Sequence, residues 1–274
     1  MSNFDRTALY NFPSCEGECR AVVRSQNFTV EQIFGAAGEL ARIESGDETI
    51  LLIPDGRGTI RGGGAEVLIR DRVVAILPPG AFDFLFESNH KIYVLTTNSF
   101  DSENCEPINA DAYRAPDTRV APVGRPFVRL SGQSEIKVFS IADIPFPPTN
   151  PRLKFIQSAT MSINWVEYNE PRDRSALSPH AHPDLEQGSL AINGEFIHHL
   201  RTPWGRNADL WRDDMHLSAT PSSLLVVSPE IIHTTEGVGT GHHLLVDVFA
   251  PPRRDFIEKG WISNAGDYRD PMAE

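Results

Sequence analysis

Apolar residues along this chain come mostly in short runs that are broken by glycine, proline and polar positions. The first half contains ETILLIPDGRG, AEVLIRDRVVAILPPG and KIYVLTT, and the second contains LKFIQSATMSINWVEY and HHLLVDVFAP. Runs of strand length that are bounded by turn residues are typical of β-strands buried on both faces. The pattern therefore predicts an all-β fold.

One segment near the N-terminus departs from this pattern. Residues 29–44, TVEQIFGAAGELARIE, contain several good helix formers and no proline. Thr29 can act as the N-cap, and Glu31 lies near the positive end of the helix dipole. We expect a short helical segment here, ahead of most of the strands.

The chain divides at a polar, proline-bearing stretch with no periodicity, residues 101–127. Strand-like segments precede it, and further strand-like segments follow the proline-rich sequence PFPPTNP. VVAILPPG and LLVVSPE each end a strand in proline, which suggests an internal duplication. We therefore expect two β-rich domains, residues 1–125 with an N-terminal extension and residues 126–274 with a C-terminal tail.

Charge and composition exclude several classes of partner. The 274 residues carry a formal net charge of −12. No cluster of lysine and arginine resembles a nucleic-acid footprint, so we expect no nucleic-acid partner. No apolar run is long enough to span a bilayer, and the first residues lack the features of a signal peptide. We expect a cytoplasmic protein without a membrane partner.

Candidate chemistry is concentrated in the second half, where eight of the nine histidines lie at or after position 180. In a strand, residues i and i+2 project from the same face, so His180 and His182 can converge on one ion. Glu186 has the same parity. His233 follows a turn that Pro229 can fix. Three imidazoles and one carboxylate suit Fe(II), Zn, Mn, Ni or Cu, and leave positions open for other ligands.

These residues resemble the cupin family. Its first motif is His-x-His, then Glu, then Gly, and here it corresponds to His180, His182, Glu186 and Gly194. The spacing to Gly194 is one residue longer than the commonest one. The second motif, a proline-bounded turn and then His, corresponds to Pro229 and His233 without the usual Pro-x-Gly. The resemblance implies jelly-roll β-barrels with one divalent metal ion, Fe(II) being the first candidate.

The first half resembles a degenerate copy of the same domain. Arg42 and Glu44 stand where the His-x-His pair would fall, and Asp83 stands where the second-motif histidine would fall. The resemblance then implies two cupin-type jelly-roll barrels, a bicupin, with the metal in the second barrel only.

Three residues near the predicted ligands are candidates for catalysis or substrate binding, on the basis of their position in the sequence. His198 and His199 are adjacent in EFIHHL, so in a strand one faces the pocket, as a proton-transfer group or as a structural histidine. Arg201 could clamp a carboxylate, or it could be an ordinary surface arginine.

The resemblance implies a metal-dependent enzyme that acts on a small polar molecule. Dioxygenase-type oxidation with Fe(II) is the first hypothesis. The second is a Zn-, Mn- or Ni-dependent isomerase, epimerase or lyase that acts on a keto-sugar or keto-acid. A non-catalytic protein that binds a small ligand is the third. Exposed strand edges and long termini favour a homodimer.

Overall fold

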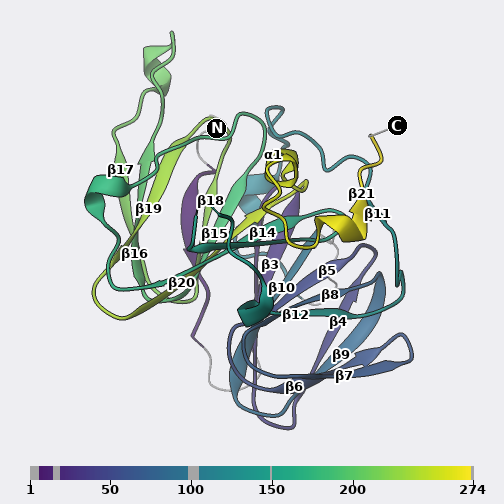
Figure 1. Ribbon diagram of the computed structural model, residues 1–274. Coiled ribbons are helices and arrows are strands. Elements are labelled where there is room, and N and C mark those ends of the chain that lie inside the picture. The colour runs from purple at the N-terminus through teal and green to yellow at the C-terminus, as the bar shows by residue number, and fades with distance from the viewer. Residues whose placement is uncertain (1–5, 15–18, 98–104, 149, 273–274) are drawn as a thin grey trace.

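The computed structural model describes residues 6–14, 19–97, 105–148 and 150–272. Strands account for nearly all of its regular structure, and they form two barrels that lie side by side (Figure 1). The all-β prediction is therefore confirmed.

The first barrel consists of two facing sheets. The larger has six strands in the order β12 (Lys137–Ser140), β8 (Val73–Leu77), β5 (Thr49–Ile53), β10 (His90–Thr97), β3 (Phe28–Gly35) and β2 (Cys19–Arg24). The smaller has four strands in the order β4 (Leu40–Ser45), β9 (Gly80–Phe86), β6 (Gly58–Gly62) and β7 (Ala65–Ile69). Apolar side chains fill the space between them.

The second barrel repeats this plan. Its larger sheet has the order β1 (Ala8–Asn11), β18 (Ser223–Val227), β15 (Gln187–Asn193), β20 (His242–Phe249), β14 (Ser162–Asn169) and β13 (Leu153–Gln157). Its smaller sheet has the order β17 (Met215–Ala219), β16 (Glu195–Arg201) and β19 (Ile232–Val238). Two short strands, β11 (Val128–Arg129) and β21 (Tyr268–Arg269), pair outside both barrels.

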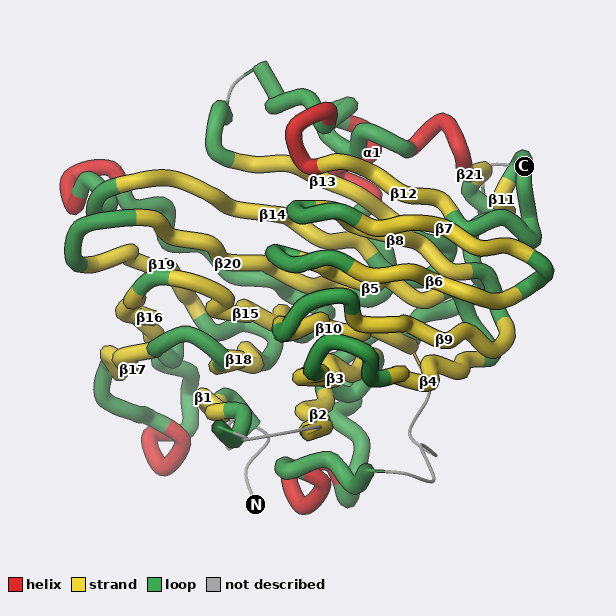
Figure 2. Tube along the Cα trace, turned by 90° about the horizontal axis from the view of Figure 1, so that it is seen from below, coloured by secondary structure: helices red, strands yellow, loops and turns green. Residues whose placement is uncertain are grey.

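Each barrel includes one strand from the other half of the chain. β1 pairs with β18 of the second barrel, and β12 pairs with β8 of the first. Figure 2 shows that strands of both halves cross the molecule in the same general direction. The domain boundary between residues 125 and 126 stays a prediction. A strand from each side of this boundary pairs with the barrel formed by the other side.

A continuous apolar core joins the two larger sheets. It includes Phe28 and Tyr93 from the first half and Trp165, Leu224 and Val246 from the second, all nearly inaccessible to solvent. Strands in these sheets have apolar neighbours on both faces, which explains why the sequence shows continuous apolar runs rather than simple alternation.

The helix expected over residues 29–44 is wrong. This segment forms β3 and β4, joined by a turn. β3 is paired on both sides, by β2 and β10, so its β-branched residues are buried in the sheet. β4 alternates strictly between exposed and buried positions, which is the period of a strand. Tertiary pairing therefore outweighs the helix propensity of Glu31 and Gln32.

Helical structure is scarce in the part of the chain that the structure describes. It comprises short 3₁₀ turns and one short α-helix, α1 (Arg254–Glu258), in the C-terminal tail. Within these residues no helix combines the length and the apolar character needed to cross a bilayer.

Candidate metal centre

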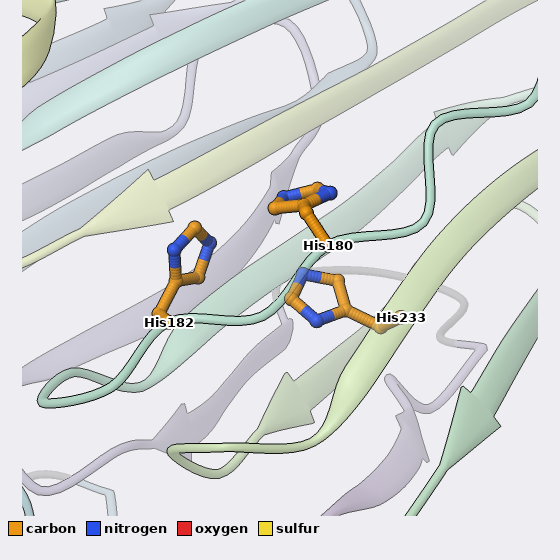
Figure 3. A group of neighbouring side chains, drawn as sticks. All are labelled: His180, His182 and His233. Carbon is orange, nitrogen blue, oxygen red and sulfur yellow. The ribbon is translucent and has the colours of Figure 1, made fainter.

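Three histidines converge inside the second barrel. His180 and His182 lie in the segment that leads into β15, and His233 lies near the start of β19. His180 and His233 are paired by two backbone hydrogen bonds, 3.0 and 2.8 Å long. The three rings are turned toward one another (Figure 3), and each offers a nitrogen within 4.8 Å of the other two. The structure therefore brings together three of the four predicted ligands.

Backbone carbonyls fix the proton on two of these rings. Nδ1 of His180 lies 2.9 Å from the carbonyl oxygen of Ser178, and Nδ1 of His233 lies 2.9 Å from that of Ile231. Nδ1–H must be the donor in both bonds, because a carbonyl oxygen only accepts. The Nε2 lone pairs of His180 and His233 are thereby left free for a metal ion.

Gln187, rather than Glu186, supplies the oxygen beside the histidines. Its Oε1 lies 2.8 Å from Nε2 of His182 and 3.1 Å from Nε2 of His233. An amide oxygen is a neutral oxygen donor, so the residues present fit a divalent ion with three nitrogen ligands and one oxygen ligand.

Glu186 does not lie beside the histidines, which corrects the predicted ligand set. It is buried, but its carboxylate faces the first half of the chain, where it accepts hydrogen bonds from the backbone N–H of Gln26 and from the hydroxyl of Tyr113. Burial raises its pKa. The chain bends at Pro183 and Asp184, so the side-chain parity of His180 and His182 does not continue to Glu186.

A polar network behind Gln187 fixes the orientation of its amide. The Nε2 group donates to Oγ of Ser189 at 3.0 Å and to Oδ1 of Asp247 at 3.1 Å. Asp247 also accepts from Ser189 and from Asn164. These bonds place the amide nitrogen away from the histidines and therefore the amide oxygen toward them. Asp247 thus acts on Gln187, as a carboxylate behind a ligand commonly does.

Burial keeps His182 and His233 in the form that binds metals. Desolvation lowers the pKa of His182 to about 3, and the cationic Arg253 contributes to the same shift. Desolvation lowers the pKa of His233 to about 4, with a further contribution from His180. Both imidazoles are therefore neutral near pH 7, and a metal ion would not have to displace a proton from them.

The three candidate catalytic residues lie in different places. His198 faces inward on β16, where Nδ1 bonds to Oγ1 of Thr235 and burial lowers its pKa to about 3. His199 and Arg201 are wrong as pocket residues. His199 lies on the outer face, between Glu236 and His216, and Arg201 forms an exposed ion pair with Asp214. The two-residue alternation of β16 separates them from His198.

The corresponding positions of the first barrel lie on its surface. Arg42 and Asp83 face each other on β4 and β9 and form an exposed ion pair at 3.2 Å. Glu44 is also exposed. In this barrel the interior positions of the same strands are apolar, for example Ile43 and Phe82.

The triad opens into a cavity of about 360 Å³. Its walls include aromatic side chains from β13, β20, α1 and the tail: Phe155, Phe249, Phe256 and Trp261. Arg253 reaches into it, with Nη1 3.0 Å from Nδ1 of His182 and the other two guanidinium nitrogens bonded to Asp255. The arrangement can hold a small molecule against an ion at the triad.

Of the two site residues that were not predicted, Gln187 and Arg253, only Gln187 has a signal in the sequence. Six residues separate Gln187 from the turn residue Gly194. The spacing that looked one residue too long from Glu186 is the usual one when it is counted from Gln187. Arg253 carries no comparable signal, because it approaches His182 only through the fold of the tail.

Comparison with known proteins supports the fold. No protein-family model matches the sequence, and no curated protein matches it either. Solved structures do match: AerE from Microcystis aeruginosa (8% identity, TM-score 0.59, 91% of this chain and 99% of that one), oxalate decarboxylase from Lactobacillus farciminis (13%, 0.58, 91% and 85%), and a cupin 2 conserved barrel domain protein from Leptotrichia buccalis (11%, 0.51, 89% and 96%). The chain therefore has the cupin fold, with two jelly-roll barrels.

Proposed function

We propose that this protein is a metal-dependent enzyme that acts on a small polar molecule in the cavity of its second barrel. The observation that supports this most strongly is the triad of His180, His182 and His233, which lines that cavity with His182 and His233 buried and His180 exposed. A purely structural barrel has no need for three converging imidazoles, and the burial of His182 and His233 costs desolvation.

Each residue of the site would have a distinct role in metal binding or substrate binding. His180, His182 and His233 would hold the ion, and Gln187 would complete the set through Oε1. Asp247 would keep the amide of Gln187 in the required orientation. When bound, a divalent ion supplies Lewis-acid polarisation, or oxygen chemistry if it is iron. Arg253 is placed to contact a substrate group beside His182.

Two reaction classes remain candidates. Oxidation of the dioxygenase type with Fe(II) is the first, because three protein nitrogens leave room for both a substrate and oxygen. Isomerase, epimerase or lyase chemistry with Zn, Mn or Ni is the second. The neutral Gln187 favours it, because an ion with no anionic protein ligand keeps its full charge for polarising a carbonyl group.

The decisive experiment measures metal content by elemental analysis of protein purified without added metal or chelator, and then oxygen uptake after anaerobic reconstitution with Fe(II). His180→Ala and His233→Ala should lose stoichiometric metal and keep their circular dichroism spectrum. His199→Ala, on the outer face, is the matched control and should keep its metal.

Each result decides between the alternatives. Stoichiometric iron with substrate-dependent oxygen uptake supports the dioxygenase. Zinc, manganese or nickel without uptake supports isomerase or lyase chemistry. Bound metal with no turnover of any oxidisable or keto compound supports a ligand-binding protein and contradicts the enzyme. No metal after reconstitution contradicts the proposal as a whole.

A further inference from the structure

The cavity of the second barrel is cationic, although the molecule carries a net charge of −12. Four basic side chains line it, Arg152, Arg172, Arg253 and Lys259, against two acidic ones, Asp247 and Asp255. Asp255 is already engaged by Arg253 and Lys259. Asp247 is occupied with Ser189, Asn164 and Gln187. Neither acid therefore neutralises the remaining arginines.

Arg152 and Arg172 are those remaining arginines. Among the described residues, no carboxylate forms an ion pair with either. Arg172 donates to two backbone carbonyls, those of Ala176 at 3.0 Å and Thr235 at 3.5 Å. Its neighbour Asp173 directs its carboxylate to Ser175. Arg152 lies immediately before β13 and makes no side-chain hydrogen bond to a described residue. Burial lowers its pKa, and the charge of Arg172 lowers it further.

Two partly buried cations that face the same cavity without counter-ions are unfavourable in the free protein. Such a cost is offset when an anion binds between them, because arginine pairs with carboxylates through charge-assisted hydrogen bonds. The bond from Arg172 to Thr235 also ties this guanidinium to β19, the strand that carries His233.

We propose that the substrate is an organic carboxylate, whose anionic group binds Arg152 and Arg172 and whose apolar part packs on the aromatic wall of Phe155, Phe256 and Trp261. These three rings are in mutual contact, with centroids 4.8 to 5.5 Å apart. This inference rests on the proposed function only in taking the same cavity as the substrate site. The arginine pair itself needs no metal.

The test uses isothermal titration calorimetry on the full chain with three probes: 3-phenylpropanoate, its neutral amide 3-phenylpropanamide, and phenyl phosphate. We expect the carboxylate to bind about tenfold more tightly than the amide, a difference of about 1.4 kcal/mol. Arg152→Gln and Arg172→Gln should each remove most of this preference. Arg61→Gln is the matched control, because Arg61 is paired with Glu66 in the first barrel.

Several outcomes would overturn the inference. Equal binding of the acid and the amide, unchanged preference in both arginine variants, or no binding of any anion at millimolar concentration would each do so. Tighter binding of phenyl phosphate would replace the carboxylate by a phosphate. If Arg172→Gln does not fold, since it loses two bonds to the backbone, Arg152→Gln still decides the question.

Repeating the titration on chelator-treated protein separates this inference from the proposed function. An arginine-dependent preference for the carboxylate in a protein that binds no metal would contradict the enzyme and support the anion site. Stoichiometric metal without that preference would support the metal-dependent function and contradict the anion site.

Discussion

At the scale of single residues, the main question is which side chain completes the metal site. Gln187→Ala should weaken metal binding about tenfold or more, because among the described residues it removes the only side-chain oxygen that lies beside the nitrogens of the triad. Glu186→Gln is the matched variant, one position away, and should leave the metal affinity unchanged. Competition with a chromophoric chelator measures both. If Glu186→Gln lost the metal and Gln187→Ala kept it, the assignment based on the structure would be contradicted.

The sequence predicted the histidines and not their oxygen partner for a physical reason. His180, His182 and His233 follow from spacing along strands and turns, which is local information. Whether Glu186 or Gln187 faces the histidines depends on the number of residues in the bend at Pro183. The usual preference of metal ions for a carboxylate led to the prediction of Glu186, which was wrong. Arg152 and Arg172 gave no local signal, since only closure of the barrel brings them to the cavity.

At the scale of elements, sequence patterns predicted strands well where both faces are buried and failed where helix formers interrupt a strand. The sequence LARIES of β4 alternates by twos, and this was outweighed by the helix-favouring residues around it. In β16, by contrast, the two-residue alternation gave a correct prediction. Its alternation predicted that only one of His198 and His199 faces inward, and the structure shows that it is His198.

The turn between β15 and β16 packs closely against β20 at Gly194. This residue has φ = 86°, and a Cβ there would lie 2.7 Å from Cδ2 of His243 and 2.9 Å from the carbonyl oxygen of His242. Gly194→Ala should lower the free energy of unfolding by about 2–3 kcal/mol, through backbone strain and this overlap.

Gly239→Ala is the matched control for this turn. Gly239 has φ = 76°, and nothing lies within 4 Å of a Cβ built there. Strain alone should then cost about 1 kcal/mol. Urea unfolding measures both variants. Equal losses would show that the contact with His243 contributes nothing.

At the scale of the whole molecule, the two barrels depend on each other. A buried ion pair links the two halves of the chain: Arg129 of β11 lies 3.0 Å from Glu48 of the first barrel. The same carboxylate accepts hydrogen bonds from the N–H of Ala159 and the hydroxyl of Tyr268, both in the second half of the chain. Separating the halves would leave this charge without its partners, which is costly for a buried group.

The last prediction follows from this dependence. A chain of residues 126–274 contains the whole histidine triad, but it lacks β1 and exposes the core face that includes Trp165 and Leu224. We expect it to aggregate or to lack near-ultraviolet circular dichroism, and to bind metal below stoichiometry, because apolar surface of this kind is unstable in water. Co-expression with residues 1–125 should recover a soluble complex that binds metal as the full chain does. Cooperative unfolding and stoichiometric metal in 126–274 alone would instead show that the second barrel is an independent domain, and that β1 and the shared core contribute little to its site.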